Sequence, residues 1–440
     1  MTDTNASRTA PKASLLTIDS HTKRRQAAEK RFRVYGIVAI VIGMLFLAVL
    51  AVSIIRSGLP AFTKTIVEVE FTLTQDEFDA AEKQLFKTKA YAGYFNAALL
   101  TKLREQGLDV EVDAKAIERI LGKTGGTIRE FYRANTEQIG QPVAFKLAAA
   151  SRVDGYFKGR VSRDTLQDSR FMQLSDLDLV DALYSAGIIR QVFNWTFITG
   201  ADSGVDNPGG AGIGASVVGS FFMMLVVLGL SLPIGVAASI YLEEFAPQNR
   251  ITDFIEVNIS NLAAVPSIVY GILGLSIFIQ VMHLPQSAPL VGGLVLTLMT
   301  LPRIIIPARA ALKAVPPSIR DAALGVGASK VQTVFHHVLP LATPGILTGL
   351  IIGLGQALGE TAPLLLIGMV GFVARGYPDG FIAGFTDPNS AMPAQIYTWA
   401  ARADVGFYEK AWGGIIILLI FLLTMNILAV ILRRKFERRW

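Results

Sequence analysis

The sequence predicts an all-α polytopic membrane protein with six transmembrane helices and an α/β domain inserted between the first and the second. Hydrophobic residues make up 52% of the 440 residues and charged residues only 17%, which excludes an ordinary soluble enzyme. Six apolar runs each come close to the ~20 residues that cross a bilayer. Between the first two runs, residues 56–208 have the mixed charge of a soluble domain.

The first apolar run predicts a transmembrane helix at residues 34–55. Lys and Arg cluster just before it, and this basic flank predicts that residues 1–33 are a cytoplasmic tail. A cleaved signal peptide is the alternative interpretation. The run is longer than the ~7–15 residues of a signal-peptide core, and Arg56–Pro60 is a poor cleavage site, so we expect the helix to be retained.

Residues 56–208 are predicted to lie outside the cytoplasm because they follow the first span. The alternation across Val67–Leu73 predicts a half-buried strand, and Thr74–Glu77 is a capping box that opens a helix. Their many Lys and Arg do not contradict this location, since the positive-inside bias weakens in loops beyond ~60 residues. We expect further helices near 114–121, 126–134 and 175–190, and a strand near 143–149.

One motif in this domain, Gly122-Lys123-Thr124, resembles the end of a phosphate-binding loop. The full pattern needs a glycine five residues earlier, where this chain has Ile117. We therefore expect a helix end and a turn here.

The chain has no cysteine, which excludes disulfides, thiol catalysis and thiolate metal sites.

Residues 209–432 are predicted to hold five further spans, near 213–242, 259–282, 288–308, 341–370 and 412–432. Counted from a cytoplasmic N-terminus, the loops at 243–258 and 309–339 and the tail at 433–440 are cytoplasmic. Lys and Arg are concentrated on that side, as the positive-inside rule requires. This topology explains the net charge of +6, so we expect membrane lipid and not nucleic acid as a partner.

The loop at 309–340 is predicted to hold two short helices joined by a glycine turn. Pro316 and Pro317 suit the start of the first helix, and Ser329 is a candidate cap for the second. Apolar residues spaced as on one helix face follow the cap, and we expect Pro340 to end that helix. The apolar residues are Val331, Val334, Phe335, Val338 and Leu339.

This loop resembles the coupling loop of ABC-importer permeases, whose pattern is Glu-Ala-Ala, three residues, Gly, and a later Leu-Pro. Asp321 replaces the Glu, and His337 stands where an isoleucine is usual. The segment Gly359–Leu365 is similar to a signature of PstA-type phosphate permeases. The resemblance covers about residues 193–432 and implies the type I ABC importer permease fold. The residues that it assigns to contact with the ATPase are Arg320, Asp321, Ala322, Ala323, Gly327, Leu339 and Pro340.

The resemblance implies a permease subunit of an ATP-driven phosphate importer in a bacterial inner membrane. Its partners would be a second permease, a dimer of ATP-binding subunits that holds ATP and Mg, and a periplasmic phosphate-binding protein. This chain would bind no cofactor and would not be an enzyme. A permease for sulfate or molybdate is an alternative. A receptor that senses through residues 56–208 is another, although only the short tail at 433–440 follows the last span.

Charged residues inside the predicted spans are candidates for the translocation pathway. Glu360 lies within the fifth predicted span, beside Thr361, and a charge at mid-bilayer costs at least ~2.5–3.5 kcal/mol. An ion pair with an Arg of another span is the alternative role for Glu360, and a hydrolase that uses it lacks a companion base. Arg303 lies between Pro302 and Pro307, which we expect to interrupt the helix. For Arg309, at the cytoplasmic end, we favour an interfacial anchor over a substrate contact.

Glycines recur every four residues in the fifth predicted span, at Gly345, Gly349 and Gly353. Such a stripe lets helices approach closely in lipid, so we favour helix packing, including packing on a partner permease, over a flexible gate. The neighbouring His336 and His337 point in different directions on a helix, and we therefore expect no metal site.

Overall fold

The computed structural model describes residues 20–105, 114–121, 124–164, 172–205, 207–369 and 377–436. Several predicted features lie outside these residues: positions 1–19 of the N-terminal tail, Gly122 and Lys123 of the Gly-Lys-Thr motif, the end of the fifth predicted span at Val370, and positions 437–440 of the C-terminal tail. The chain divides into two compact units, Met1–Arg56 and Ser57–Trp440, and each is described by itself.

The first unit consists of most of helix α1 (Ser20–Gly58), which contains the predicted first span and begins earlier than its apolar run. Its large apolar side chains are exposed all along the run, from Phe32 to Ile55. A helix that is apolar on every side is stable only in lipid or inside protein. This exposure is therefore what a membrane span presents.

The second unit begins with an α/β domain, which we define as β1–β3 and the helices between them. Its sheet is antiparallel in the order β2-β1-β3, with β1 at Thr63–Phe71, β2 at Val143–Ala148 and β3 at Ile189–Phe193. The predicted first strand and the capping box at Thr74 are confirmed. The helices are α2 (Gln75–Lys83), α3 (Lys87–Glu105), α4 (Ala114–Ile120), α5 (Gly125–Ala134), α6 (Ser151–Phe157) and α7 (Leu174–Ser185).

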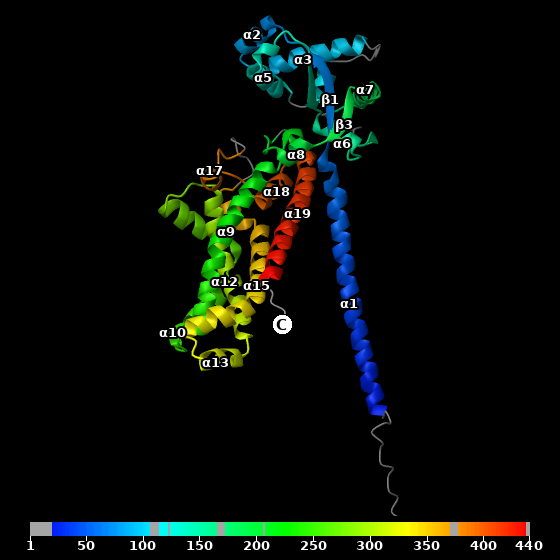
Figure 1. The fold of residues 1–440 in the computed structure, drawn as a ribbon. Helices are drawn as coiled ribbons and strands as arrows, with labels where there is room; N and C mark the ends of the chain where they lie inside the picture. The colour runs from blue at the N-terminus through cyan, green and yellow to red at the C-terminus, as the bar shows by residue number, and fades with distance from the viewer. Residues whose placement is uncertain are drawn as a thin grey trace, which may run out of the picture. The chain divides into compact units, whose positions relative to one another are not determined.

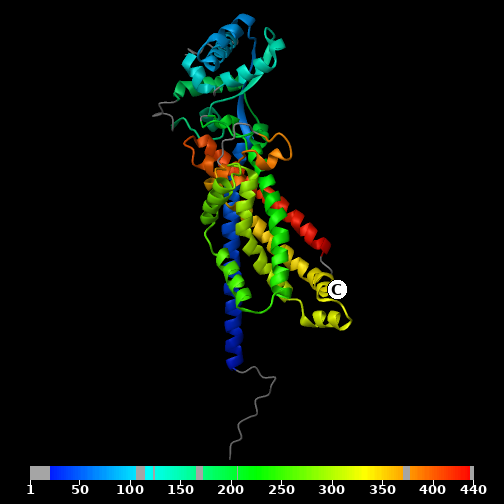
Figure 2. The same cartoon turned by 90° about the vertical axis from the view of Figure 1, so that its left-hand side faces the viewer.

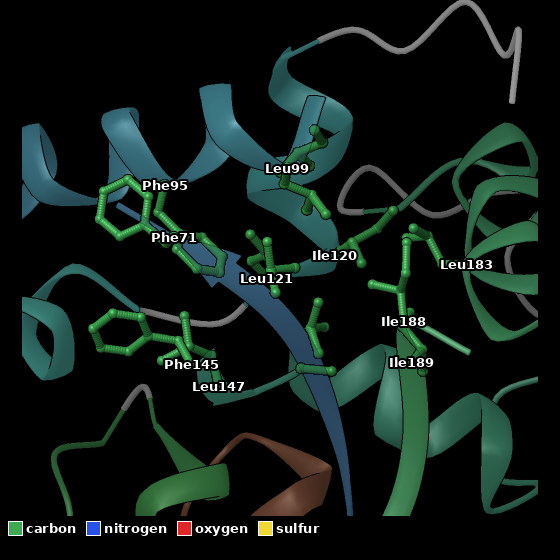
Figure 3. Packing of buried hydrophobic residues seen from close by; sticks show 14 of the residues in the cluster. Phe71, Phe95, Leu99, Ile120, Leu121, Phe145, Leu147, Leu183, Ile188 and Ile189 are labelled. Atoms are coloured by element: carbon green, nitrogen blue, oxygen red, sulfur yellow. The ribbon is translucent and has the colours of Figure 1, made fainter. Parts of the chain in front are cut away.

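The core of the α/β domain is rich in aromatic rings that pack edge to face. Figure 3 shows Phe71 of β1, Phe95 of α3 and Phe145 of β2 gathered together, and the rings of Phe71 and Phe95 are 5.6 Å apart. The predicted end of the helix at 175–190 is wrong. The helix stops at Ser185 because Gly187 takes the left-handed conformation, and the following residues pair with the second edge of β1 as β3.

The rest of the second unit is helical, and α9, α12 and α15 run side by side in it (Figures 1 and 2). Five helices of the described chain are long and apolar enough to cross a membrane, and a bent pair gives a sixth candidate. The helices are α8 (Trp195–Thr199), α9 (Gly214–Ile240), α10 (Arg250–Ala263), α11 (Ser267–Leu273), α12 (Pro289–Lys313), α13 (Pro317–Gly325), α14 (Lys330–Gln332), α15 (Leu339–Gly359), α16 (Ala362–Leu366), α17 (Ala383–Thr386), α18 (Met392–Ala400) and α19 (Val405–Phe436).

The span expected at 259–282 is not one straight helix. Helices α10 and α11 meet at an angle of 103°. Pro266 precedes α11, lacks an N–H, and restricts Val265 to an extended backbone, which explains the break. The span expected at 341–370 is also interrupted, because α15 ends at Gly359 and the short helix α16 starts at Ala362.

Two expectations about prolines are wrong. Helix α12 continues through Pro302 and Pro307, although each interior proline costs about 3 kcal/mol in an isolated helix. Pro340 does not end its helix, since a π-helical stretch at Thr333–Val338 leads into α15 and places Pro340 in the first turn, where a missing N–H is tolerated. Packing on neighbouring helices outweighs the local preference in α12.

The glycine stripe of α15 packs on α12 of the same chain. A β-carbon at Gly349 would lie 2.7 Å from Cγ of Pro307, and one at Gly345 would lie 2.6 Å from Cβ of Ala311. These distances are shorter than ordinary contacts between carbon atoms, so the two helices can come this close only because these positions are glycine. The Pro307 ring fills the space that Gly349 leaves.

A buried network of ion pairs joins the α/β domain to the last span, α19. Lys158 lies 2.6 Å from the carboxylate of Asp154 and 2.8 Å from that of Glu409 in α19. Arg160 lies 2.6 Å from the other oxygen of Glu409. Lys158 and Glu409 are each only 4% exposed. We call these four residues the joint.

Candidate functional site

The structure brings together two of the predicted pathway residues, Arg303 and Glu360. Arg303 projects from the middle of α12, and Glu360 occupies the break between α15 and α16, where its backbone is extended. The guanidinium Nη1 lies 3.7 Å from the carboxylate Oε1, and the two side chains are 26% and 22% exposed. Glu360 is therefore at the end of its helix and not inside it, and it faces an Arg of another span.

This pair is loose compared with the other ion pairs of the core. A distance of 3.7 Å is too long for a hydrogen bond, and neither side chain forms a hydrogen bond with any other residue in the part of the chain that is described. Charge attraction holds the two groups near each other, while the five N–H donors of the guanidinium remain available. Such donors match the geometry of an oxyanion.

The surrounding backbone is tightly packed. A β-carbon at Gly271 of α11 would lie 2.7 Å from Cα of Pro363 in α16, so the segment after the α10–α11 bend lies against the segment after the α15–α16 break. Irregular backbone at membrane depth is tolerated only where it is buried in protein or lines an aqueous cavity. The two breaks and the Arg303–Glu360 pair thus form one polar region among apolar spans.

Arg309 has different surroundings. Its guanidinium is 2.6 Å from the carboxylate of Glu256 in α10 and 3.3 Å from that of Glu243 at the end of α9. Arg309 lies six residues beyond Arg303, which is about 9 Å along the helix axis. Arg309 thus joins α12 to α10 and to the segment that follows α9, and the interfacial anchor favoured from the sequence stays a prediction. Neither carboxylate could be recognised as its partner from the sequence.

The predicted loop forms a compact helical hairpin. Helix α13 is followed by Gly327 with φ +89°, and Ser329 caps the next helix in a capping box with Gln332. Ala323 is buried at 5% exposure, whereas Asp321 and Ala322 are exposed. The small residues of the motif therefore have two roles. Ala323 packs against the protein, whereas Ala322 leaves a flat, accessible helix surface.

Arg320 connects the loop to the end of α9. It forms hydrogen bonds with both carboxylate oxygens of Glu244, the closer at 2.5 Å, and with the carbonyl oxygens of Leu312 and Val315 at 2.9 and 2.7 Å. The hydrogen bonds with Glu244 raise the pKa of Arg320 further above its usual value. Its charge is thus held within the chain. Two consecutive acidic residues directly after an apolar run were the signal that could have identified Glu244.

Apolar side chains on the loop are exposed where no lipid is expected. Val326 is 87% exposed and Leu324 is 49% exposed. Of the apolar residues expected on one face of the second helix, Val334 and Val338 are buried, whereas Phe335 is 49% exposed. An exposed apolar patch on a polar loop is typical of a protein-protein contact.

Residues 231–440 match the protein family described as "Binding-protein-dependent transport system inner membrane component". A probable ABC transporter permease protein of Bacillus subtilis, YqgI, is 30% identical over 257 residues, which are 56% of this chain and 86% of that protein. Phosphate transport system permease protein PstA 1 of Mycobacterium tuberculosis is 30% identical over 52% of this chain and 72% of its own length. The chain belongs to the PstA-type ABC permease family. PstA of Yersinia pestis is 28% identical over 52% of this chain and 75% of its own length.

The matched segment of this permease includes Arg303, Glu360 and the whole loop. The relatives are permease subunits, so this chain is a transport subunit and not an enzyme. Residues 19–167, which include α1 and most of the α/β domain, match a separate family described as "Domain of unknown function (DUF3333)". Within the described residues, no three His, Asp or Glu side chains are placed to hold a metal ion.

Proposed function

We propose that this permease is a subunit of an ATP-driven phosphate importer and forms half of its translocation pathway. The observation that carries the proposal is the similarity to proteins named phosphate transport system permease protein PstA, which extends over the segment that contains the Arg303–Glu360 pair. Phosphate is a multivalent oxyanion, and a guanidinium with unused donors recognises such groups by paired hydrogen bonds.

In this proposal Glu360 competes with the anion for Arg303. When no anion is present, Glu360 neutralises Arg303, which lowers the cost of keeping a charge among apolar spans. An arriving phosphate replaces the carboxylate at Arg303, and the nearby negative charge of Glu360 then weakens phosphate binding. Weak binding suits a pathway, because the anion must also leave. Thr361, next to Glu360, offers a hydroxyl to the same anion. Arg309 stays an anchor.

The loop at 309–340 is proposed to couple transport to ATP hydrolysis. Asp321, Ala322 and Gly327 are exposed and available to an ATPase subunit, together with the apolar Leu324 and Val326. Arg320 links α13 to Glu244, so a displacement of α13 would move the end of α9 as well. ATP binding would close the ATPase dimer and rotate the spans as rigid bodies, and hydrolysis would reverse the motion.

The remaining proposals concern partners and location. We propose a second permease, a dimer of ATP-binding subunits with ATP and Mg, and a periplasmic phosphate-binding protein. The protein would reside in a bacterial inner membrane with both termini in the cytoplasm, which the Arg and Lys at the start of α1 and at the end of α19 support. Residues 56–208 would then form a periplasmic domain, and residues 209–432 the permease core.

Uptake of radiolabelled phosphate tests this proposal. Cells without the gene should lose a high-affinity uptake component that excess sulfate does not inhibit, and the wild-type gene should restore it. Arg303→Gln and Glu360→Ala should each lower uptake at least about tenfold, the value of one charge-assisted interaction. Glu130→Ala, which removes an exposed carboxylate of the α/β domain, is the matched control and should transport normally.

The alternatives give different results. Loss of sulfate or molybdate uptake with unchanged phosphate uptake would assign the importer to another oxyanion. Normal uptake by Glu360→Ala, at normal amounts of inserted protein, would reduce the Arg303–Glu360 pair to a packing contact. The first result addresses the substrate and the second addresses the site, so the two parts of the proposal can fail separately.

A further inference from the structure

An apolar groove lies between the spans α9, α15 and α19. Its cavity has a volume of about 410 Å³. Leu and Met side chains of α9 form one wall, Leu347–Leu358 of α15 the second, and Leu422–Lys435 of α19 the third. Asn426 and Lys435 are the polar members among the described residues that line it.

The groove has the length of one leaflet of a bilayer. From Leu347 to Leu358, α15 rises about 16 Å, at about 1.5 Å per residue. Half of a hydrocarbon core of ~30 Å is about 15 Å. Leu428 and Ile431 both line the groove and are more than 60% exposed, so the groove is accessible from the surrounding lipid.

Positive charge is placed at one end of this groove. Lys435 belongs to the lining itself. Arg433 bridges α19 and α15, because its Nη1 donates a hydrogen bond to the hydroxyl of Thr348 at 3.1 Å. Its Nε is buried and has no partner among the described residues. No acidic side chain lines the groove within the described chain, so the charge is not neutralised there.

We propose that this groove binds an anionic glycerophospholipid, with one acyl chain between the three spans and the phosphate at Arg433 and Lys435. A phosphate oxygen can accept a hydrogen bond from the ammonium of Lys435, which lines the groove, and an acyl chain covers the exposed leucines. The positive-inside rule places cations near the end of any span. It does not predict a groove of leaflet length that leads to them.

The test is native mass spectrometry of the purified full-length permease with its partner subunits, titrated with phosphatidylglycerol or with phosphatidylcholine of the same acyl chains. Phosphatidylglycerol should bind more tightly. Lys435→Gln should lower the affinity for phosphatidylglycerol about fivefold, the effect of one cation near a membrane surface. Arg434→Gln is the matched control, because Arg434 is the adjacent cation but is exposed and does not line the groove. It should change the affinity less than twofold.

A second pair of variants tests the apolar part. Gly355 lines the groove, and a β-carbon there would have ordinary contacts, so Gly355→Leu fills the cavity. This substitution should lower the affinity for both lipids at least fivefold. Gly229→Leu, a change of equal size in α9 outside the lining, should leave the affinities unchanged. Equal affinity for the two lipids, or equal effects of Lys435→Gln and Arg434→Gln, would overturn the proposal.

The competing occupant is a helix. The chain has no cysteine, so Gly355→Cys can be combined with Leu45→Cys on α1, whose Leu45 is 62% exposed. Efficient disulfide formation in membranes would show that α1 fills the groove, and this too would overturn lipid binding. Absence of that crosslink together with the expected lipid affinities supports the proposal.

Discussion

Lys158 at the joint is the residue whose loss should most weaken the attachment of the α/β domain to the membrane core. Its ammonium lies 2.6 Å from Asp154, 2.8 Å from Glu409 and 2.8 Å from the carbonyl oxygen of Thr63. Lys158→Met keeps most of the buried stem and removes the charge. The substitution leaves two carboxylates with Arg160 as their remaining ion-pair partner in the joint.

The structure sets the size of the effect. Removing one partner of a buried ion pair costs about 3–5 kcal/mol. Arg160 stays within 2.6 Å of Glu409 and 3.4 Å of Asp154, so we expect the lower end, about 3 kcal/mol. For a domain of about 150–250 residues this lowers the thermal unfolding midpoint by about 6–12 °C, at about 2–4 °C per kcal/mol.

Tryptophan fluorescence during heating measures that midpoint, since Trp399 is fully buried and packs on Phe197, whose ring is covered by Lys410, the neighbour of Glu409. Lys146→Met is the matched control: Lys146 pairs with Glu68 at 3.7 Å, is 59% exposed, and should lower the midpoint by less than about 2 °C. Glu409→Gln combined with Lys158→Met should cost less than the sum of the single variants. Additive losses, or equal midpoints for Lys158→Met and Lys146→Met, would refute the reasoning.

Three further changes have defined outcomes. Ala322→Asp places a charge on the exposed face of α13; the protein should insert normally but lose phosphate uptake and co-purify with less ATPase. Gly349→Ala should destabilise the contact between α15 and α12 by about 1–3 kcal/mol, whereas Gly355→Ala, which meets its nearest neighbour at 3.8 Å, should leave the unfolding midpoint unchanged. Hydrogen bonding to Arg129 lowers the pKa of Glu82 to about 2, from an unfolded value near ~4.3. This pair therefore stabilises the fold above about pH 4.3 and loses its effect as the pH falls toward 2, so Arg129→Gln should lower the unfolding midpoint at pH 6 but not at pH 2.

Features that depend on a few neighbouring residues could be predicted from the sequence. The capping boxes at Thr74 and Ser329 and the turn at Gly327 are all present, because a side chain and a backbone group three residues apart need no distant partner. The helices able to cross a membrane could also be predicted from the apolar runs, since only length and composition decide whether a helix can cross a bilayer.

Whether a given proline interrupts its helix could not be predicted from the sequence. Pro266 breaks a span, whereas Pro302 and Pro307 do not interrupt α12, although each lies in an apolar run. The local cost of the residue is the same in each case. The outcome depends on tertiary contacts such as that of the Pro307 ring with Gly349, and such contacts join residues far apart in the chain.

The candidate site was predictable in part. Charge in an apolar run identified Arg303 and Glu360, and a pair with an Arg of another span was one of the two roles considered for Glu360. The acidic partners of Arg309 and Arg320 were missed because Glu243, Glu244 and Glu256 lie in or beside a polar loop, where carboxylates are common. Only the tertiary packing of these segments, including that of α13, which carries Arg320, places them next to those guanidinium groups.

Three of the Arg-carboxylate pairs of the core suggest a division of work. Arg320 with Glu244 and Arg309 with Glu256 are hydrogen-bonded at 2.5 and 2.6 Å, and each joins separate elements at the end of the core that carries the loop. The Arg303–Glu360 pair is 3.7 Å apart and has no hydrogen bond. A rigid-body transport cycle needs contacts that persist and contacts that break in each turnover. A pair without hydrogen bonds separates at low cost, so we propose that the tight pairs transmit force and that the loose pair lies where the anion passes.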